Sequence, residues 1–205
     1  MNLVFDFGAV LFNWQPDEIL RDWFPKRAQS LQQAKALAAD VFHHPDWQAF
    51  DQGALALEDV VLRTAHRLEL DSAKFGELVA QIPDRLTPID GTVQLLRDLA
   101  QRRRAQGDVR LHFLSNMPSP FARALEQRHE FLGLFEGGIF SGDVQLIKPQ
   151  PEIFELLQRR FGLDPHQTLF IDDLKSNVQA AQACGWQAVQ FETAQQLQQH
   201  LGRVL

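Results

Sequence analysis

The chain has 205 residues, of which 45% are hydrophobic and 22% are charged, and 20 basic against 26 acidic side chains give a net charge of −6. This composition excludes a disordered, collagenous or disulfide-stapled protein, and predicts one globular domain or one domain with an insertion. The acidic balance disfavours nucleic-acid binding, which needs a clustered basic surface. The one dense basic run, residues 102–104, is interpreted as the solvated end of a helix.

The cysteine content and the hydropathy pattern bear on the compartment. The single cysteine, Cys184, lies in an alanine-rich stretch and is expected to pack as a small apolar side chain. No apolar run approaches the roughly 18 residues of a membrane span, and the absence of Lys or Arg before Arg21 disfavours a secretory signal. We therefore expect a cytoplasmic protein without a membrane partner. The sequence is compatible with either a monomer or a homodimer.

The first predicted element is a buried strand at residues 3–5. From about residue 16 to residue 85 no strand pattern occurs, and apolar positions recur three and four residues apart, most clearly at 30–42 and 58–70. This pattern predicts an all-helical cap, residues 16–86, inserted after the first strand. The segments 12–15 and 86–88 are its expected linkers. Residues 1–15 and 87–205 then form the core.

The rest of the chain alternates strand and helix patterns. Such alternation favours right-handed crossovers and a parallel sheet covered on both faces. The sequence therefore predicts a doubly wound, Rossmann-like α/β core. The expected strands are 109–114, 138–140, 168–171 and 188–190, and the expected helices are 93–103, 121–127, 151–161, 178–184 and 194–201.

Polar residues that carry chemistry follow several predicted strands. In an open α/β sheet, ligands bind outside the carboxyl ends of the strands, so these positions are expected to lie together. Each position alone is a weak signal, and the ordered set is a strong one. The positions are Asp6 and Gly8 after the first strand, Ser115 and Asn116 after the second, Lys148 before the helix at 151–161, and Asp172 and Asp173 after the fourth.

Three carboxylates at one sheet edge repel one another unless a cation lies among them. Hard oxygen ligands suit Mg²⁺, which commonly binds one or two carboxylates together with phosphate oxygens. Asp6 is then placed to attack phosphorus and form an aspartyl-phosphate. Ser115 and Asn116 are expected to hydrogen-bond phosphoryl oxygens, and Lys148 to supply a positive charge.

The same segments carry a family resemblance. Residues 4–11, 114–116, 148–154 and 170–177 resemble, in order, the four motifs of the haloacid dehalogenase-like hydrolases. The resemblance covers essentially the whole chain, and within the family it looks like a bacterial phosphatase subgroup related to the N-terminal domain of bifunctional epoxide hydrolases. It implies that Asp6 is the nucleophile, that Asp172 and Asp173 are metal-site carboxylates, and that Ser115 and Lys148 contact phosphate.

Gly8 departs from the resemblance, which implies a second aspartate there to protonate the leaving group. The Gly8 carbonyl can still bind Mg²⁺, but general acid help is typically worth 10²–10⁴-fold. Asp46, His43 and His44 of the cap are candidate substitutes, although an exposed turn is the favoured interpretation of that cluster. A structural reading of Gly8 is that only glycine tolerates the backbone conformation or the close approach at this position.

Three functions remain open at this level. The first is a Mg²⁺-dependent phosphatase for a small phosphorylated metabolite such as a sugar phosphate, because a cap over the site favours a small substrate. The second is a 2-haloacid dehalogenase, which attacks carbon and needs no metal. The third is a catalytically weak member that binds a metabolite or a partner. Trp14, Trp47 and Phe50 are candidate pocket residues, and core packing is the competing interpretation for each.

Overall fold

The computed structural model describes all residues from Met1 to Leu205. Its centre is a five-stranded sheet in the order β3-β2-β1-β4-β5, in which every neighbouring pair is parallel. This arrangement confirms the predicted doubly wound α/β fold. The strands are β1 (Asn2–Phe5), β2 (Arg110–Ser115), β3 (Gly137–Phe140), β4 (Thr168–Asp172) and β5 (Gln187–Gln190).

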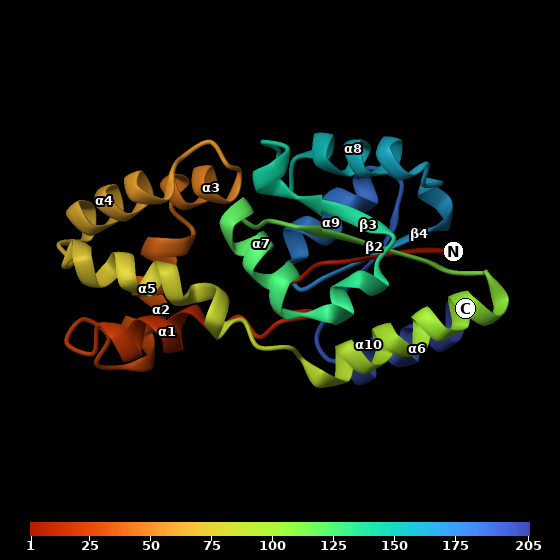
Figure 1. The fold of residues 1–205 in the computed structure, drawn as a ribbon, viewed down its shortest axis with the longest axis horizontal. Helices are drawn as coiled ribbons and strands as arrows, with labels where there is room; N and C mark the ends of the chain where they lie inside the picture. The colour runs from red at the N-terminus through yellow and green to blue at the C-terminus, as the bar shows by residue number, and fades with distance from the viewer.

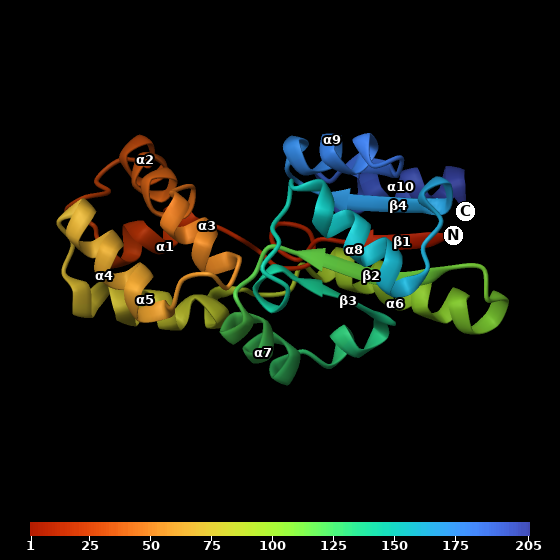
Figure 2. The ribbon, with the colours of Figure 1, turned by 90° about the horizontal axis from the view of Figure 1, so that it is seen from above.

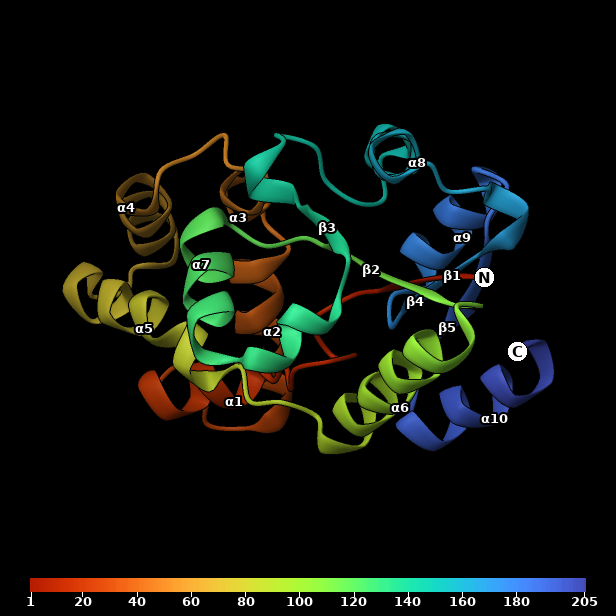
Figure 3. The same cartoon turned by 45° about the vertical axis from the view of Figure 1, so that its right-hand side comes forward.

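Helices cover both faces of the sheet, with α8 and α9 on one face and α6 and α10 on the other (Figure 1). Alternate residues of a strand pack on opposite faces of the sheet. In β1, Leu3 and Phe5 pack in the larger core with α6 and α10, and Val4 packs in the smaller core with α8 and α9. Helices α6 and α10 lie side by side (Figure 3). The core helices are α6 (Asp90–Gln106), α7 (Ser119–Arg128), α8 (Pro151–Phe161), α9 (Lys175–Ala183) and α10 (Ala194–Val204).

The predicted helical insertion is a separate group of five helices beyond the carboxyl ends of the strands (Figures 1 and 2). A capping box of Ser30 and Gln33 starts α2. Pro83 lies inside the last turn of α5. The helices are α1 (Pro16–Trp23), α2 (Leu31–Phe42), α3 (Pro45–Asp51), α4 (Leu57–Leu68) and α5 (Ser72–Arg85).

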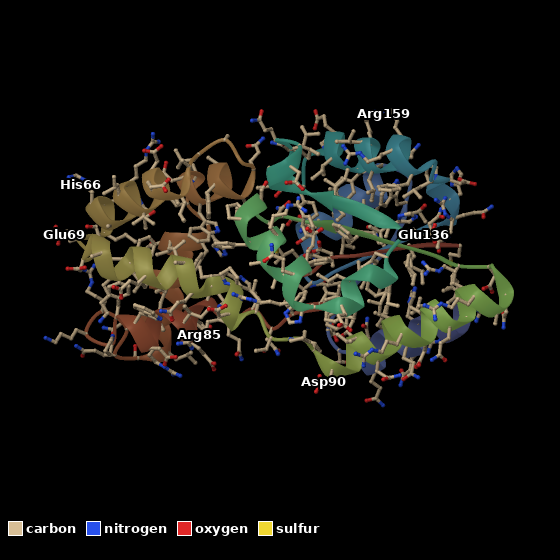
Figure 4. The ribbon with its side chains drawn as sticks, in the orientation of Figure 1. His66, Glu69, Arg85, Asp90, Glu136 and Arg159 are labelled. Atoms are coloured by element: carbon tan, nitrogen blue, oxygen red, sulfur yellow. The ribbon has the colours of Figure 1, made fainter.

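The two linkers between this bundle and the core run together. Phe12 and Pro88 form an antiparallel bridge. The Asn13 backbone N–H donates to the Thr87 carbonyl at 2.8 Å, and the Asn13 side chain donates to the Thr87 hydroxyl at 3.0 Å. The bundle therefore leaves and rejoins the core at one place, and in Figure 4 Arg85 lies on the bundle side of the return linker and Asp90 on the core side.

The bundle also touches the core beside β3. The Phe50 ring packs edge-on against Phe121 of α7, with centroids 5.6 Å apart. The Ser141 hydroxyl donates to the Asp51 carbonyl at 2.6 Å. Phe50 and Trp47 are buried in this packing, as the core interpretation expects, and Trp14 is only partly buried. None of the helices combines the length and the apolar character that crossing a lipid bilayer requires.

Candidate active site

Strands β1 and β4 are neighbours at the centre of the sheet, although β2 and β3 lie between them in sequence. This is the point where the strand order reverses, and a crevice forms outside the carboxyl ends at such a point. Asp6 directly follows β1, and Asp172 is the last residue of β4. The carboxylates of Asp6, Asp172 and Asp173 each have an oxygen within 4.8 Å of the others. The strand-end reasoning therefore places these three residues together correctly.

Lys148 lies among these carboxylates. Its ammonium is 2.9 Å from Oδ1 of Asp6 and donates to Oδ2 of Asp172 at 2.7 Å, and its side chain is almost completely buried. The Phe7 backbone N–H also donates to Asp6 Oδ1, at 2.7 Å. Both contacts on Asp6 therefore involve the same oxygen, and Oδ2 makes no hydrogen bond within the protein.

The two aspartates of the pair at 172 and 173 have different surroundings. Asp172 is fully buried, and its Oδ1 accepts hydrogen bonds from the Leu174 backbone N–H at 2.8 Å and from the Asn177 amide at 3.0 Å. Its other oxygen is bound to Lys148. Asp173 is partly exposed, and its carboxylate has no hydrogen-bond partner in the protein. Of the two, Asp173 has the carboxylate that is free to accept a ligand.

The charges in this cluster are unbalanced, with three carboxylates against one ammonium. Burial raises the pKa of Asp6 to about 7, against the opposing effect of Lys148, and Asp172 raises it further. Burial followed by the charge of Asp172 raises the pKa of Asp173 to about 6. Burial alone lowers the pKa of Lys148, but the carboxylates of Asp172 and Asp6 outweigh it, so that this pKa is raised. The ammonium is therefore held in its charged form, and the excess negative charge can accommodate a cation.

The second strand contributes two residues with different roles. The Ser115 hydroxyl is buried at the end of β2 and makes no hydrogen bond within the protein, so it is available to a ligand. The Asn116 side chain is engaged elsewhere: its Oδ1 accepts the Lys148 backbone N–H at 2.8 Å, and its Nδ2 donates to the Lys148 carbonyl at 3.0 Å. The Asn116 side chain therefore holds the lysine loop and keeps one Nδ2 hydrogen without a partner, so its expected contact with phosphoryl oxygens stays a prediction.

Gly8 is not required for steric reasons. Its φ is not positive, and a Cβ atom built at this position meets no atom within 4 Å. The neighbouring Ala9, with φ of 56°, is the residue in the left-handed region. The structural reading of Gly8 is therefore wrong, and the position two residues after Asp6 opens onto free space.

The proposed acid substitutes in the cap are committed to other contacts. The Asp46 carboxylate is 3.5 Å from the Arg63 guanidinium and 3.4 Å from Nδ1 of His44. His44 is the N-cap of α3, and its Nδ1 accepts the Asp46 backbone N–H at 3.1 Å. His43 is exposed on the same helix boundary. This cluster begins a helix, which is a structural role.

Sequence reasoning gave no role to Asn177 or Ser141. The Asn177 amide holds both oxygens of Asp172 at 3.0 Å. Ser141 follows β3 directly, and its hydroxyl accepts the Met117 backbone N–H at 2.8 Å while donating to the bundle at Asp51. The strand-end rule applied to β3 would have identified Ser141. The spacing of five residues between Asp172 and Asn177, one helical turn beyond a strand end, was the signal for Asn177.

The fold and this site define a doubly wound α/β hydrolase with a carboxylate at the end of its first strand and a helical insertion facing it. The sequence model of the haloacid dehalogenase-like hydrolases matches residues 3–185. The chain belongs to this family, as the four motifs imply.

Two curated relatives are phosphatases by name. A sesquiterpene phosphatase of Aspergillus oryzae is 26% identical over 182 residues, which cover 89% of this chain and 85% of that protein. The phosphoglycolate phosphatase of Escherichia coli is 35% identical over 79 residues, which cover 38% of this chain and 31% of that protein. The second match thus concerns a limited segment of both proteins.

Solved structures share the fold of the whole chain. A haloacid dehalogenase family enzyme of Bacteroides thetaiotaomicron, in complex with magnesium and inorganic phosphate, matches with a TM-score of 0.69 and 19% identity, over 93% of both chains. The L-2-haloacid dehalogenase of Xanthobacter autotrophicus matches with a TM-score of 0.70 and 21% identity, over 98% of this chain and 81% of the other. At these identities the likeness establishes the fold and leaves the reaction open.

Proposed function

We propose that this hydrolase is a Mg²⁺-dependent phosphatase that acts on a small phosphorylated metabolite through an aspartyl-phosphate on Asp6. The observation that carries the proposal is the arrangement of Asp6 itself. One of its oxygens is fixed by Lys148 and by the Phe7 N–H, and the other is free beside two further carboxylates. A carboxylate oriented in this way, with a fixed positive charge next to it, is suited to attack an electrophilic phosphorus.

The residues around Asp6 fit a magnesium ion. We assign the ligands as one carboxylate oxygen of Asp6, the Gly8 carbonyl and the Asp173 carboxylate, with water and phosphate oxygens completing the set, and the other Asp6 oxygen as the one that attacks phosphorus. The oxygens of Asp172 are bound to Lys148 and Asn177, so we assign this residue to holding Lys148 in place. Bound here, magnesium supplies charge stabilisation for a phosphoryl group next to the nucleophile.

The phosphate-binding groups come from the end of β2 and from the segment between β3 and α8. The Ser115 hydroxyl is free, and the Lys148 ammonium lies within hydrogen-bonding distance of the nucleophile. As the phosphoryl group bonds to Asp6, these groups are placed to stabilise its non-bridging oxygens. Asn116 contributes indirectly, since it fixes the backbone that carries Lys148.

The helical bundle, residues 16–86, is proposed to act as a cap. It lies beyond the carboxyl ends of the strands, where it faces the site (Figure 2). A cap in this position excludes water and contacts the leaving group of a small substrate. The two relatives named as phosphatases for a sesquiterpene and for phosphoglycolate support a phosphatase, and they differ too much in their substrates to choose one.

The 2-haloacid dehalogenase reading is the competing function. It shares the nucleophile and the fold, but it requires no metal, and three clustered carboxylates with a free Asp173 are unfavourable without a cation. A dehalogenase would release chloride from 2-chloropropionate and would be insensitive to a chelator.

The deciding experiment measures phosphate release from a panel of phosphorylated metabolites, with Mg²⁺ and with EDTA. We expect release that depends on Mg²⁺ and that is abolished in Asp6→Asn, which keeps the volume of the side chain and removes the nucleophile. Chloride release from 2-chloropropionate is measured in parallel. Phosphate release from no member of the panel would overturn the proposal, and chloride release that persists in EDTA would replace it by the dehalogenase reading.

A further inference from the structure

We propose that the site is specialised for phosphoanhydrides, in which the phosphoryl group is bonded to a carboxylate or to a second phosphate, in preference to phosphate esters of alcohols. The inference rests on the proposed phosphatase function and concerns only the leaving group. It follows from the open space next to Gly8 and from the contacts that each carboxylate of the cluster makes.

No carboxyl group near Asp6 is available to protonate a leaving group. The charged groups beside the Asp6 carboxylate are Lys148, Asp172 and Asp173. Asp172 is fully buried and bound by three groups. Asp173 faces Asp6 as a free carboxylate and is the proposed metal ligand. At Gly8, two residues after the nucleophile, there is open space and no side chain.

The Lys148 ammonium is also a poor proton donor. It is held between the carboxylates of Asp6 and Asp172, at 2.9 and 2.7 Å. Giving up its proton would leave the buried carboxylates without their counter-charge. Lys148 therefore stabilises charge and does not deliver a proton.

The first step then depends on the leaving group. An oxygen of Asp6 bonds to phosphorus, the bond from phosphorus to the leaving oxygen breaks, and the electron pair of that bond stays on the leaving oxygen. A carboxylate or a phosphate departs as a stable anion without a proton. An alkoxide is a far stronger base and requires one, and a positioned general acid is typically worth about 10²–10⁴-fold for such a step.

The second step, hydrolysis of the aspartyl-phosphate, also releases a stable carboxylate. Water bonds to phosphorus, the bond between phosphorus and Asp6 breaks, and the electron pair returns to the Asp6 carboxylate. The water proton passes to the released phosphate or to solvent. An aspartyl-phosphate is itself an acyl phosphate, so the reaction cycle that Asp6 supports already contains one phosphoanhydride cleavage. A phosphoanhydride substrate makes both half-reactions chemically alike.

The test compares acetyl phosphate with glycerol 3-phosphate in the wild type, Gly8→Asp and Gly8→Asn. A Cβ atom at position 8 meets no atom within 4 Å, and of the two variants only aspartate adds an acid. The wild type is expected to favour acetyl phosphate in kcat/KM by at least about 100-fold, and Gly8→Asp to raise kcat/KM for glycerol 3-phosphate by about 10-fold or more. Gly8→Asn is expected to raise it for neither substrate. Asp6→Asn serves as the blank for spontaneous hydrolysis.

A graded series of aryl phosphates tests the wild type without any substitution at Gly8. The rate is expected to fall steeply as the leaving phenol becomes less acidic. A flat series, or kcat/KM values for the first two substrates within about 10-fold of each other, would overturn the inference and leave the phosphatase intact. An equal gain in Gly8→Asp and Gly8→Asn would overturn it as well. If no substrate releases phosphate, the proposed function itself fails, and this inference with it.

Discussion

Asn116 binds the backbone of Lys148 at both of its polar groups, accepting the N–H at 2.8 Å and donating to the carbonyl at 3.0 Å. This pair joins the loop after β2 to the loop that precedes α8. Because the ammonium of Lys148 bridges Asp6 and Asp172, the position of that backbone determines where the positive charge lies. Asn116 is therefore a positioning residue.

The first prediction concerns this pair. Asn116→Ala is expected to lower kcat by about 10- to 100-fold with a smaller change in KM, since a displaced charge weakens stabilisation of the reacting group more than substrate binding. Asn116→Asp, which keeps the acceptor for the Lys148 N–H, should recover part of the loss. Steady-state kinetics check both variants. If the amide instead bound phosphate, KM and inhibition by inorganic phosphate would change while kcat stayed constant.

The second prediction concerns the buried charge of Lys148. Lys148→Met leaves the buried carboxylates of Asp6 and Asp172 without a counter-charge, and it is expected to lower the free energy of unfolding by about 3 kcal/mol near neutral pH. The loss should shrink at about pH 5.5, because Asp6 is then protonated in both proteins. Its pKa is about 7 beside Lys148, and removal of the ammonium, which lowers this pKa, raises it further. Urea unfolding at both pH values provides the measurement.

The control for this variant is Lys175→Met, which removes an exposed lysine at the start of α9. It should change stability little, since an exposed charge loses little solvation on folding. Equal effects of the two substitutions would contradict the central position assigned to Lys148.

The third prediction concerns metal binding and pH. A metal ligand must be deprotonated, and burial and Asp172 raise the pKa of Asp173 to about 6. Protons therefore compete with Mg²⁺ once the pH falls through this range, and the Mg²⁺ affinity measured by calorimetry should decrease from pH 8 toward about pH 5. Asp173→Asn should abolish most of the binding, whereas Asp46→Asn in the bundle should not affect it. An affinity that is constant over this range would contradict the assignment.

The fourth prediction concerns His112 of β2, which is not one of the active-site residues. Its ring is fully buried against Phe161, and neither ring nitrogen has a hydrogen-bond partner. Burial, followed by the charge of Arg110, lowers its pKa below the ordinary value of 6.5. The unfolded chain then binds a proton below pH 6.5 that the folded chain does not, so this residue makes stability fall with falling pH, by up to about 1.4 kcal/mol per pH unit.

His112→Leu removes this titration. The difference in unfolding free energy between variant and wild type should therefore rise in favour of the variant as the pH falls from 7 to about 5. Chemical denaturation at several pH values measures it. Parallel stability curves would show that the folded protein protonates the ring as easily as the unfolded chain does.

The sheet was predictable because its central strands are buried on both faces. Runs such as 109–114 are mostly apolar and are bounded by turn residues, which leaves little ambiguity, and β2 covers Arg110–Ser115. The insertion was recognisable by the absence of such runs. The course of the cap helices was harder to predict from the sequence. Proline ordinarily interrupts a helix, but Pro83 lies inside the last turn of α5.

The composition of the site was predictable from residues at strand ends, whereas their partners were not. A sequence shows that Asp172 and Asp173 are adjacent, but only the fold shows that Lys148 and Asn177 occupy the first and leave the second free. The same holds for Asn116, whose amide has the right chemistry for phosphate and also binds the backbone of Lys148. Side chains of identical type acquire different roles from contacts between distant loops.

The paired linkers have a consequence for how this architecture can change. Because Asn13 and Thr87 are hydrogen-bonded neighbours, the seventy-odd residues between them begin and end at adjacent points of the core. A short turn joining these two positions would close the chain without moving β1 or α6. The covalent connection of the bundle is therefore confined to one pair of adjacent linkers, and we expect that a different insertion at this point could replace the bundle.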